Sequence, residues 1–129
     1  MLDTVSRYIK YINSIKPLDS ESRFYLLLEI AQDTTAGRVA RDIVIEQNLR
    51  LVISIAKRYT GKALDFTSLI QEGNIGLIKA VDTYNVGKKV KFSTYASILI
   101  KRCIQYALNT KSRSIRLPVY LELKLYKYN

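Results

Sequence analysis

Apolar residues recur every three or four positions along most of the chain, which is the spacing of amphipathic helices. Only two prolines and five glycines interrupt the sequence, so the segments between them are long. We predict five helices. The first ends at Lys16-Pro17, and the second runs from an Asp19 or Ser20 cap to Ala31. The third runs from Thr35 to Tyr59, the fourth from an Asp65 cap to Tyr84, and the fifth from a Ser93 or Thr94 cap to Arg113. In the third of these, Val39, Ile43, Val44, Leu51, Val52, Ile55, Ala56 and Tyr59 are expected to face inward. The predicted fold class is all-α.

Three glycines and the C-terminal tail add detail to this picture. Gly61 is suited to cap the end of the third predicted helix. Gly73 and Gly76 lie inside the fourth, where glycine costs about 1 kcal/mol relative to alanine. They indicate either a close approach between helices or a surface kept bare for a partner. The segment 119–125 alternates apolar and polar residues as a strand does, although its leucine, glutamate and lysine favour helix, so its conformation stays open.

Composition narrows the class of protein. With 129 residues, 48% apolar and 25% charged, the chain matches one ordinary globular domain. It has no membrane-spanning run of apolar residues and no signal-peptide layout, so we expect neither a membrane nor a secreted protein, which leaves the cytoplasm. One cysteine, Cys103, excludes an internal disulfide, and the absence of histidine removes the usual metal ligand and general base. We therefore expect no metal, no cofactor and no enzymatic activity.

The net charge of +10 is distributed unevenly. Residues 1–82 carry 11 basic against 10 acidic side chains, whereas residues 83–129 carry 10 basic side chains against Glu122 alone. Basic residues scattered over a surface can simply be solvated, and an anionic membrane is a rival partner. Their concentration in the last third of the chain favours a nucleic acid.

The fifth predicted helix has two faces. One face is apolar and is expected in the core: Ala96, Leu99, Ile100, Cys103 and Ala107. The other carries groups that suit base edges and phosphates: Ile98, Arg102, Gln105 and Asn109, with Lys101 beside them. In the loop before it, lysines 88, 89 and 91 alternate with the aromatic residues Tyr84, Phe92 and Tyr95, as single-stranded nucleic acid binding requires. The alternative for each ring is a place in the core, above all for Phe92.

The stretch NLRLVISIAKRYTGKALDFTSLIQEGNIGLIKAVDTYNVGKKVKFSTYAS, residues 48–97, resembles domain two of bacterial RNA polymerase sigma factors. RSIRLPVYLELKLYKYN resembles the start of the following sigma domain, and residues 3–40 are compatible with the helices that precede domain two. The resemblance implies a compact bundle of about five to six helices. It divides the chain into domain two with its preceding helices, residues 1–114, and a linker with the start of domain three, residues 115–129. Nothing resembles the helix-turn-helix domain that reads the minus-thirty-five element, so we expect a fragment, with one half of a split sigma factor as the alternative.

The resemblance implies a promoter-recognition subunit that docks on the clamp helices of the largest RNA polymerase subunit. It is expected to open the minus-ten element and bind its nontemplate strand. Polymerase contacts carry over to Gln71, Glu72, Asn74 and Ile78. DNA contacts carry over to Asn48, Arg50, Leu51, Tyr84, Lys88, Lys89, Phe92, Thr94, Tyr95, Ile98, Lys101, Arg102, Gln105, Arg113 and Arg116. The alternative is an interaction-only subunit that binds the clamp and needs a second polypeptide to read DNA.

Departures from the family pattern refine these expectations. Principal sigma factors carry a tryptophan pair where this chain has Ile98 and Leu99, and the chain has no tryptophan, which suggests an alternative, non-housekeeping sigma factor. Asn85 stands where an acidic residue often helps to read the flipped adenine, so the identity of that base is open. Tyr120 and Leu123 replace polar readers of the extended minus-ten sequence, and we assign no such contact. The resemblance also admits an anti-sigma factor as a partner.

Overall fold

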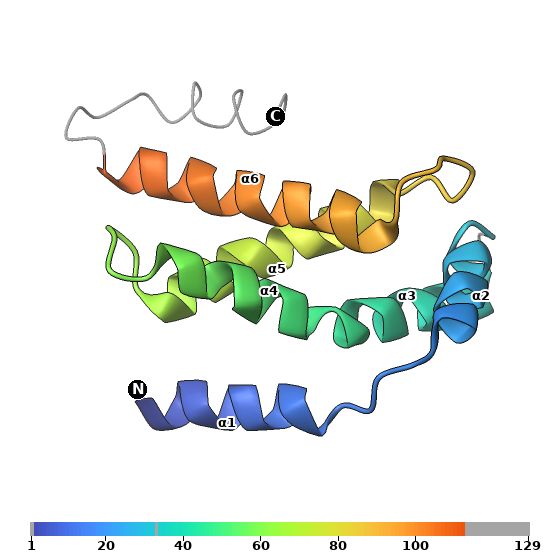
Figure 1. Ribbon diagram of the computed structural model, residues 1–129, viewed down its shortest axis with the longest axis horizontal. Helices are drawn as coiled ribbons and strands as arrows, with labels where there is room; N and C mark the ends of the chain where they lie inside the picture. Colours follow the sequence, from blue (N-terminus) through green and yellow to red (C-terminus); the bar gives the residue numbers. More distant parts are fainter. Residues whose placement is uncertain (1, 33, 113–129) are drawn as a thin grey trace.

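The computed structural model describes residues 2–32 and 34–112 (Figure 1). Within these residues it contains six α-helices, one short 3-10 helix and no strand, so the all-α prediction is confirmed. The helices are α1 (Leu2–Ser14), α2 (Ser20–Ile30), α3 (Thr35–Gln47), α4 (Leu49–Ala56), η1 (Lys57–Tyr59), α5 (Phe66–Thr83) and α6 (Phe92–Ser112). The linker and domain-three start predicted at 115–129, the open segment 119–129, and the phosphate contacts Arg113 and Arg116 lie outside the described residues. No described helix combines the length and apolarity needed to cross a membrane.

The helix boundaries follow from local chemistry. Asp19 caps α2, because its side chain accepts a hydrogen bond from the Ser22 amide, and Asp65 caps α5 in the same way. These bonds lower the pKa of both carboxyl groups below the ordinary value of 3.8. Gly61 adopts the left-handed conformation (φ 85°) just after η1, as predicted for a C-terminal cap. The predicted helix caps Asp19, Asp65 and Gly61 are therefore confirmed. The predicted stop at Pro17 is confirmed as well, because α1 ends before it.

The prediction of one helix from Thr35 to Tyr59 is wrong, because the chain bends at Asn48 between α3 and α4. The Asn48 side chain donates to the Val44 carbonyl, with 2.7 Å between Nδ2 and O, while its backbone amide turns to Ile45. A short polar side chain that takes a helix carbonyl in this way competes with the regular backbone bond. Within α3, Val44 is in the core, but Val39 is 55% exposed. Ile43 is exposed too, so the predicted inward face of α3 is partly wrong.

Helix α6 begins at Phe92, one residue before the predicted Ser93 cap, because the Lys91 carbonyl already accepts from the Tyr95 amide. The predicted division of α6 into two faces is confirmed. Of the predicted core face, Ala96, Ile100 and Cys103 are buried, while Leu99 and Ala107 are half-buried. Two residues that the prediction did not include, Ile104 and Leu108, are also buried.

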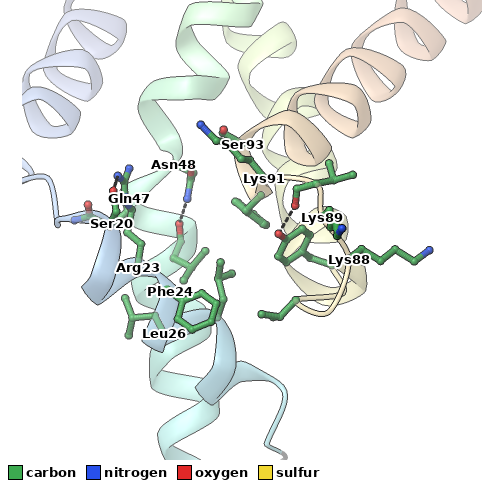
Figure 2. Close-up of a pocket in the computed structure, with 16 residues that line it drawn as sticks. Ser20, Arg23, Phe24, Leu26, Gln47, Asn48, Lys88, Lys89, Lys91 and Ser93 are labelled. Carbon is green, nitrogen blue, oxygen red and sulfur yellow. Dashed lines mark hydrogen bonds between the residues drawn. The ribbon is translucent and has the colours of Figure 1, made fainter.

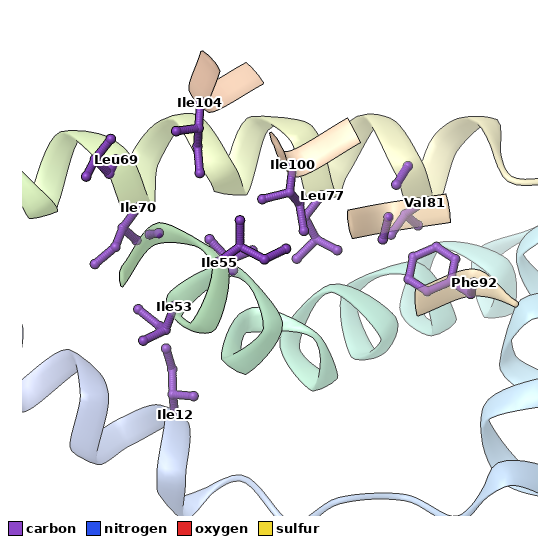
Figure 3. Packing of buried hydrophobic residues seen from close by; sticks show 14 of the residues in the cluster. Ile12, Ile53, Ile55, Leu69, Ile70, Leu77, Val81, Phe92, Ile100 and Ile104 are labelled. Carbon is purple, nitrogen blue, oxygen red and sulfur yellow. The ribbon is translucent and has the colours of Figure 1, made fainter. Parts of the chain in front are cut away.

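The core lies where α4, α5 and α6 meet (Figure 3). A Cβ atom at Gly73 would lie 2.7 Å from Cγ1 of Val52, and one at Gly76 would lie 2.7 Å from Cα of Ile100. Both glycines are buried. They permit close helix packing, so the alternative of a surface kept bare for a partner is wrong.

The remaining helices surround this core unequally. Helices α5 and α6 lie side by side, and α1 packs on α4 away from α6 (Figure 1). Helix α2 packs on α3 at one end of the molecule, and the loop between α5 and α6 lies at the same end (Figure 1). The basic loop between α5 and α6 therefore lies opposite α2 and α3, although these segments are far apart in the sequence.

Candidate nucleic-acid interface

A cleft of about 510 Å³ separates α2 and the α3–α4 junction from the loop that precedes α6 (Figure 2). Apolar and aromatic side chains line part of it: Phe24, Leu26, Leu27, Val44, Tyr84, Val86, Val90 and Phe92. Polar and basic side chains line the rest: Ser20, Arg23, Gln47, Asn48, Lys88, Lys89, Lys91 and Ser93. Apolar walls with cations beside them can hold a flat ring while its phosphate stays near solvent.

Tyr84 is the centre of a ring cluster on one wall of this cleft. Its centroid lies 5.2 Å from that of Phe92, edge to face, and 5.6 Å from that of Tyr95. The Tyr84 hydroxyl donates to the Val90 carbonyl, and the Tyr95 hydroxyl shares a 2.6 Å hydrogen bond with Thr83. Phe92 is only 9% exposed and belongs to the core, as expected. It supports Tyr84 and also lines the cleft, and its assignment as a DNA contact stays a prediction.

Three of the expected DNA contacts that are close in the sequence have different surroundings in the structure. Asn48 lines the cleft. Leu51 is half-buried against the core, and Arg50 does not line the cleft. Instead, the Arg50 guanidinium donates to the carbonyls of Ile12 and Ile15 at the end of α1, with both Nη2–O distances at 3.3 Å.

The polar stripe of α6 is solvent-exposed. Ile98 is 46% exposed, and Arg102, Gln105 and Asn109 are also exposed, with Lys101 half-buried beside them. Thr94, Lys88 and Lys89 are exposed nearer the cleft. Gln105 donates to the Tyr59 hydroxyl over 3.3 Å, which brings the turn after α4 against this stripe.

Sequence reasoning missed several residues at these surfaces. The turn after α4 is basic and exposed, with Lys57, Arg58 and Lys62. Arg23 and Phe24 of α2 line the cleft. The charge cluster in AKRYTGK was a readable signal, but nothing local indicated that α2 would lie opposite the loop at 84–91, because that contact joins distant segments.

The expected polymerase contacts on α5 differ in their surroundings. Gln71 and Ile78 are exposed on one side, with the exposed Ile75 between them, a residue that the prediction omitted. Asn74 instead faces α1, where its Nδ2 donates to the Tyr8 hydroxyl over 3.3 Å. Asn74 is half-buried there, and its assignment as a polymerase contact stays a prediction.

Two charged groups flank this side of α5. Glu72 is half-buried, and that burial raises the pKa of its carboxyl group above 4.5, with Lys79 acting in the opposite direction. Near the end of the helix, Asp82 accepts two hydrogen bonds from Arg41 of α3, at 2.6 and 3.1 Å. This fork-like pair joins α3 to α5.

Comparison with known proteins is consistent with this architecture. The model of the Sigma-70 region 2 family matches residues 44–114, more than half of the chain, and the chain belongs to this family. The chain is also similar to the RNA polymerase sigma factor SigA of Clostridium acetobutylicum, with 45% identity over 120 residues. That alignment covers 92% of this chain and 31% of SigA, so the chain spans about a third of the relative's length. The similarity to SigA does not support the expected alternative, non-housekeeping type.

Proposed function

We propose that the chain acts as the promoter-recognition part of a sigma factor. In this role it binds core RNA polymerase, recognises the minus-ten element and stabilises the melted nontemplate strand. The observation that carries the proposal is the ring-lined, lysine-bearing cleft, which lies next to an exposed polar stripe on α6. Membership of the Sigma-70 region 2 family supports it. The proposed role is one of binding without catalysis, in the bacterial cytoplasm.

The two surfaces suit two states of DNA. In the cleft, Tyr84, against which Tyr95 packs, offers an aromatic face for an unstacked base, and Asn48 offers a hydrogen-bonding group at the opposite wall. On α6, Arg102 and Gln105 carry the groups that read base edges in a duplex groove, and Lys101 can neutralise a phosphate. We propose that duplex DNA lies along α6 and that the separated strand enters the cleft.

We propose the exposed side of α5 as the docking site for the clamp helices of the polymerase's largest subunit. It presents Gln71 in a row with Ile75 and Ile78, which are each 38% exposed. A surface with exposed isoleucines and few charges suits a protein partner better than a phosphate backbone. An anti-sigma factor is a further proposed partner of the chain. We also propose that residues 1–114 act as one domain, with 115–129 leading into the next.

We propose that the chain is of the alternative sigma type in one respect, its ability to open a duplex. Ile98 lies on the exposed stripe, where an aromatic wedge would reach DNA, whereas Leu99 is half-buried and packs against the core. An aliphatic side chain offers less flat surface to replace a lost base stack. We therefore propose that this chain holds melted DNA better than it melts a duplex.

The decisive experiment measures fluorescence anisotropy with single-stranded oligonucleotides whose minus-ten-like sequence is varied one base at a time. The proposed function predicts clear base preference. Equal affinity for every sequence would instead favour an interaction-only subunit that needs a second polypeptide to read DNA. Lys88→Ala and Lys89→Ala should weaken all sequences about equally, because phosphate contacts carry no sequence information.

A further inference from the structure

In the segment between α1 and α2, a side chain from α3 bonds to the backbone on both sides of Pro17. The Gln47 carboxamide donates from Nε2 to the Lys16 carbonyl over 2.9 Å, and its Oε1 accepts from the Leu18 amide over 3.0 Å. Pro17, between them, has no N–H group to offer. Gln47 therefore pairs with the polar backbone groups on both sides of the proline.

Arg50 holds the preceding end of α1. Its guanidinium donates to the Ile12 carbonyl, which also accepts from the Ile15 amide, and to the Ile15 carbonyl just after the last turn of the helix. A cation at this position also interacts favourably with the helix dipole. We call Gln47 and Arg50 together the linker clamp.

The linker clamp lies next to the cleft. Ser20, Arg23 and Phe24, at the start of α2, line the cleft, and Gln47 lines it as well. Helix α2 has no fully buried residue and touches the core only through half-buried apolar side chains, so its position also depends on contacts outside the core. Its far end is held close to α3, because a Cβ at Gly37 would lie 2.8 Å from the Glu29 carbonyl. The linker clamp holds the backbone that leads into the near end.

We propose that Gln47 and Arg50 are positioning residues that set the distance between α2 and the loop at 84–91, and with it the base preference of the cleft. Arg50 acts on DNA through α1 and the linker, without contacting a phosphate. The proposal rests on the proposed function, because base preference is its readout.

The first test measures hydrogen exchange of the Leu18 amide by NMR in the 129-residue chain. Gln47→Ala removes its acceptor and should speed exchange about five-fold, the equivalent of one ordinary hydrogen bond. Gln47→Glu retains the acceptor and should keep most of the protection. Gln32→Ala, an exposed glutamine outside the linker clamp, is the matched control. Unchanged Leu18 exchange in Gln47→Ala would overturn the proposal.

The second test separates positioning from direct contact. Arg50→Ala should lower the affinity for the preferred oligonucleotide about five-fold and reduce the spread between sequences, with an unchanged salt slope. Arg38→Ala is the matched control, since the described bond of that exposed arginine is to Thr35 in its own helix. If the slope of log affinity against log salt became about 0.7 less steep in Arg50→Ala, Arg50 would contact a phosphate, against the proposal.

Melting temperatures of the variants would show whether each still folds. Arg50→Lys, which keeps the charge, should retain much of the base preference. Retained base preference in both Gln47→Ala and Arg50→Ala would also overturn the proposal. If the unmodified chain shows no base preference, the proposed function fails, while Leu18 exchange still reports on the linker clamp itself.

Discussion

A Cβ atom at Gly76 of α5 would lie 2.6 Å from the Leu99 carbonyl oxygen of α6. The backbones of the two longest helices are thus in direct contact at the centre of the core. Because α5 carries the proposed polymerase surface and α6 the proposed DNA stripe, this contact fixes the two surfaces relative to each other.

Gly76→Ala should destabilise the fold by about 1–3 kcal/mol, since overpacking against backbone exceeds the gain in helix propensity of about 1 kcal/mol. Chemical denaturation followed by circular dichroism measures the change. Gly87→Ala is the control, because the nearest atom to a Cβ there is the Asn85 side chain. Equal stability of Gly76→Ala and the unmodified chain would show that α5 and α6 can separate without cost.

Gln71→Ala combined with Ile78→Ala should weaken binding to the clamp fragment of the largest polymerase subunit at least about ten-fold, because both side chains are exposed on one side of α5. Titration with the purified fragment measures it. Ser54→Ala, on the exposed side of α4, should bind normally. Normal binding by the folded double variant would place the interface elsewhere.

Tyr84→Ala should weaken single-strand capture by about 1–3 kcal/mol, the value of one base–aromatic stack. Tyr84→Phe keeps the ring and loses the hydroxyl bond to Val90, so it should retain most of the affinity. Anisotropy with the preferred oligonucleotide distinguishes the two. A loss as large in Tyr84→Phe as in Tyr84→Ala would mean that Tyr84 acts only by holding the loop through its hydroxyl group, and that its ring does not stack on a base.

Ile98→Trp should narrow the difference in affinity between a pre-melted bubble and a duplex template, because a wedge that replaces the lost stack makes base extrusion less costly. At 46% exposure the position should accept the larger ring without loss of stability. Open-complex yield with reconstituted polymerase on matched templates is the measurement. If the unmodified chain already performs equally on both, the missing tryptophan does not limit melting.

Features governed by neighbours in the chain could be predicted from the sequence. The Asp19 and Asp65 caps, the stop at Pro17 and the left-handed Gly61 each depend on interactions within a few residues. The two faces of α6 follow from its periodicity, because burial on one side of a helix repeats every three or four residues.

Features that depend on contacts between distant segments were decided by the tertiary structure. The role of Gly73 and Gly76 required the positions of Val52 and Leu99. Arg50 and Asn74 are polar residues that a sequence motif assigns to partners, yet their hydrogen bonds are made to α1. Their polar groups can be satisfied by any nearby backbone or side chain, and a linear sequence does not say which one will be nearby. The cleft itself exists only because folding brings α2 opposite the loop at 84–91.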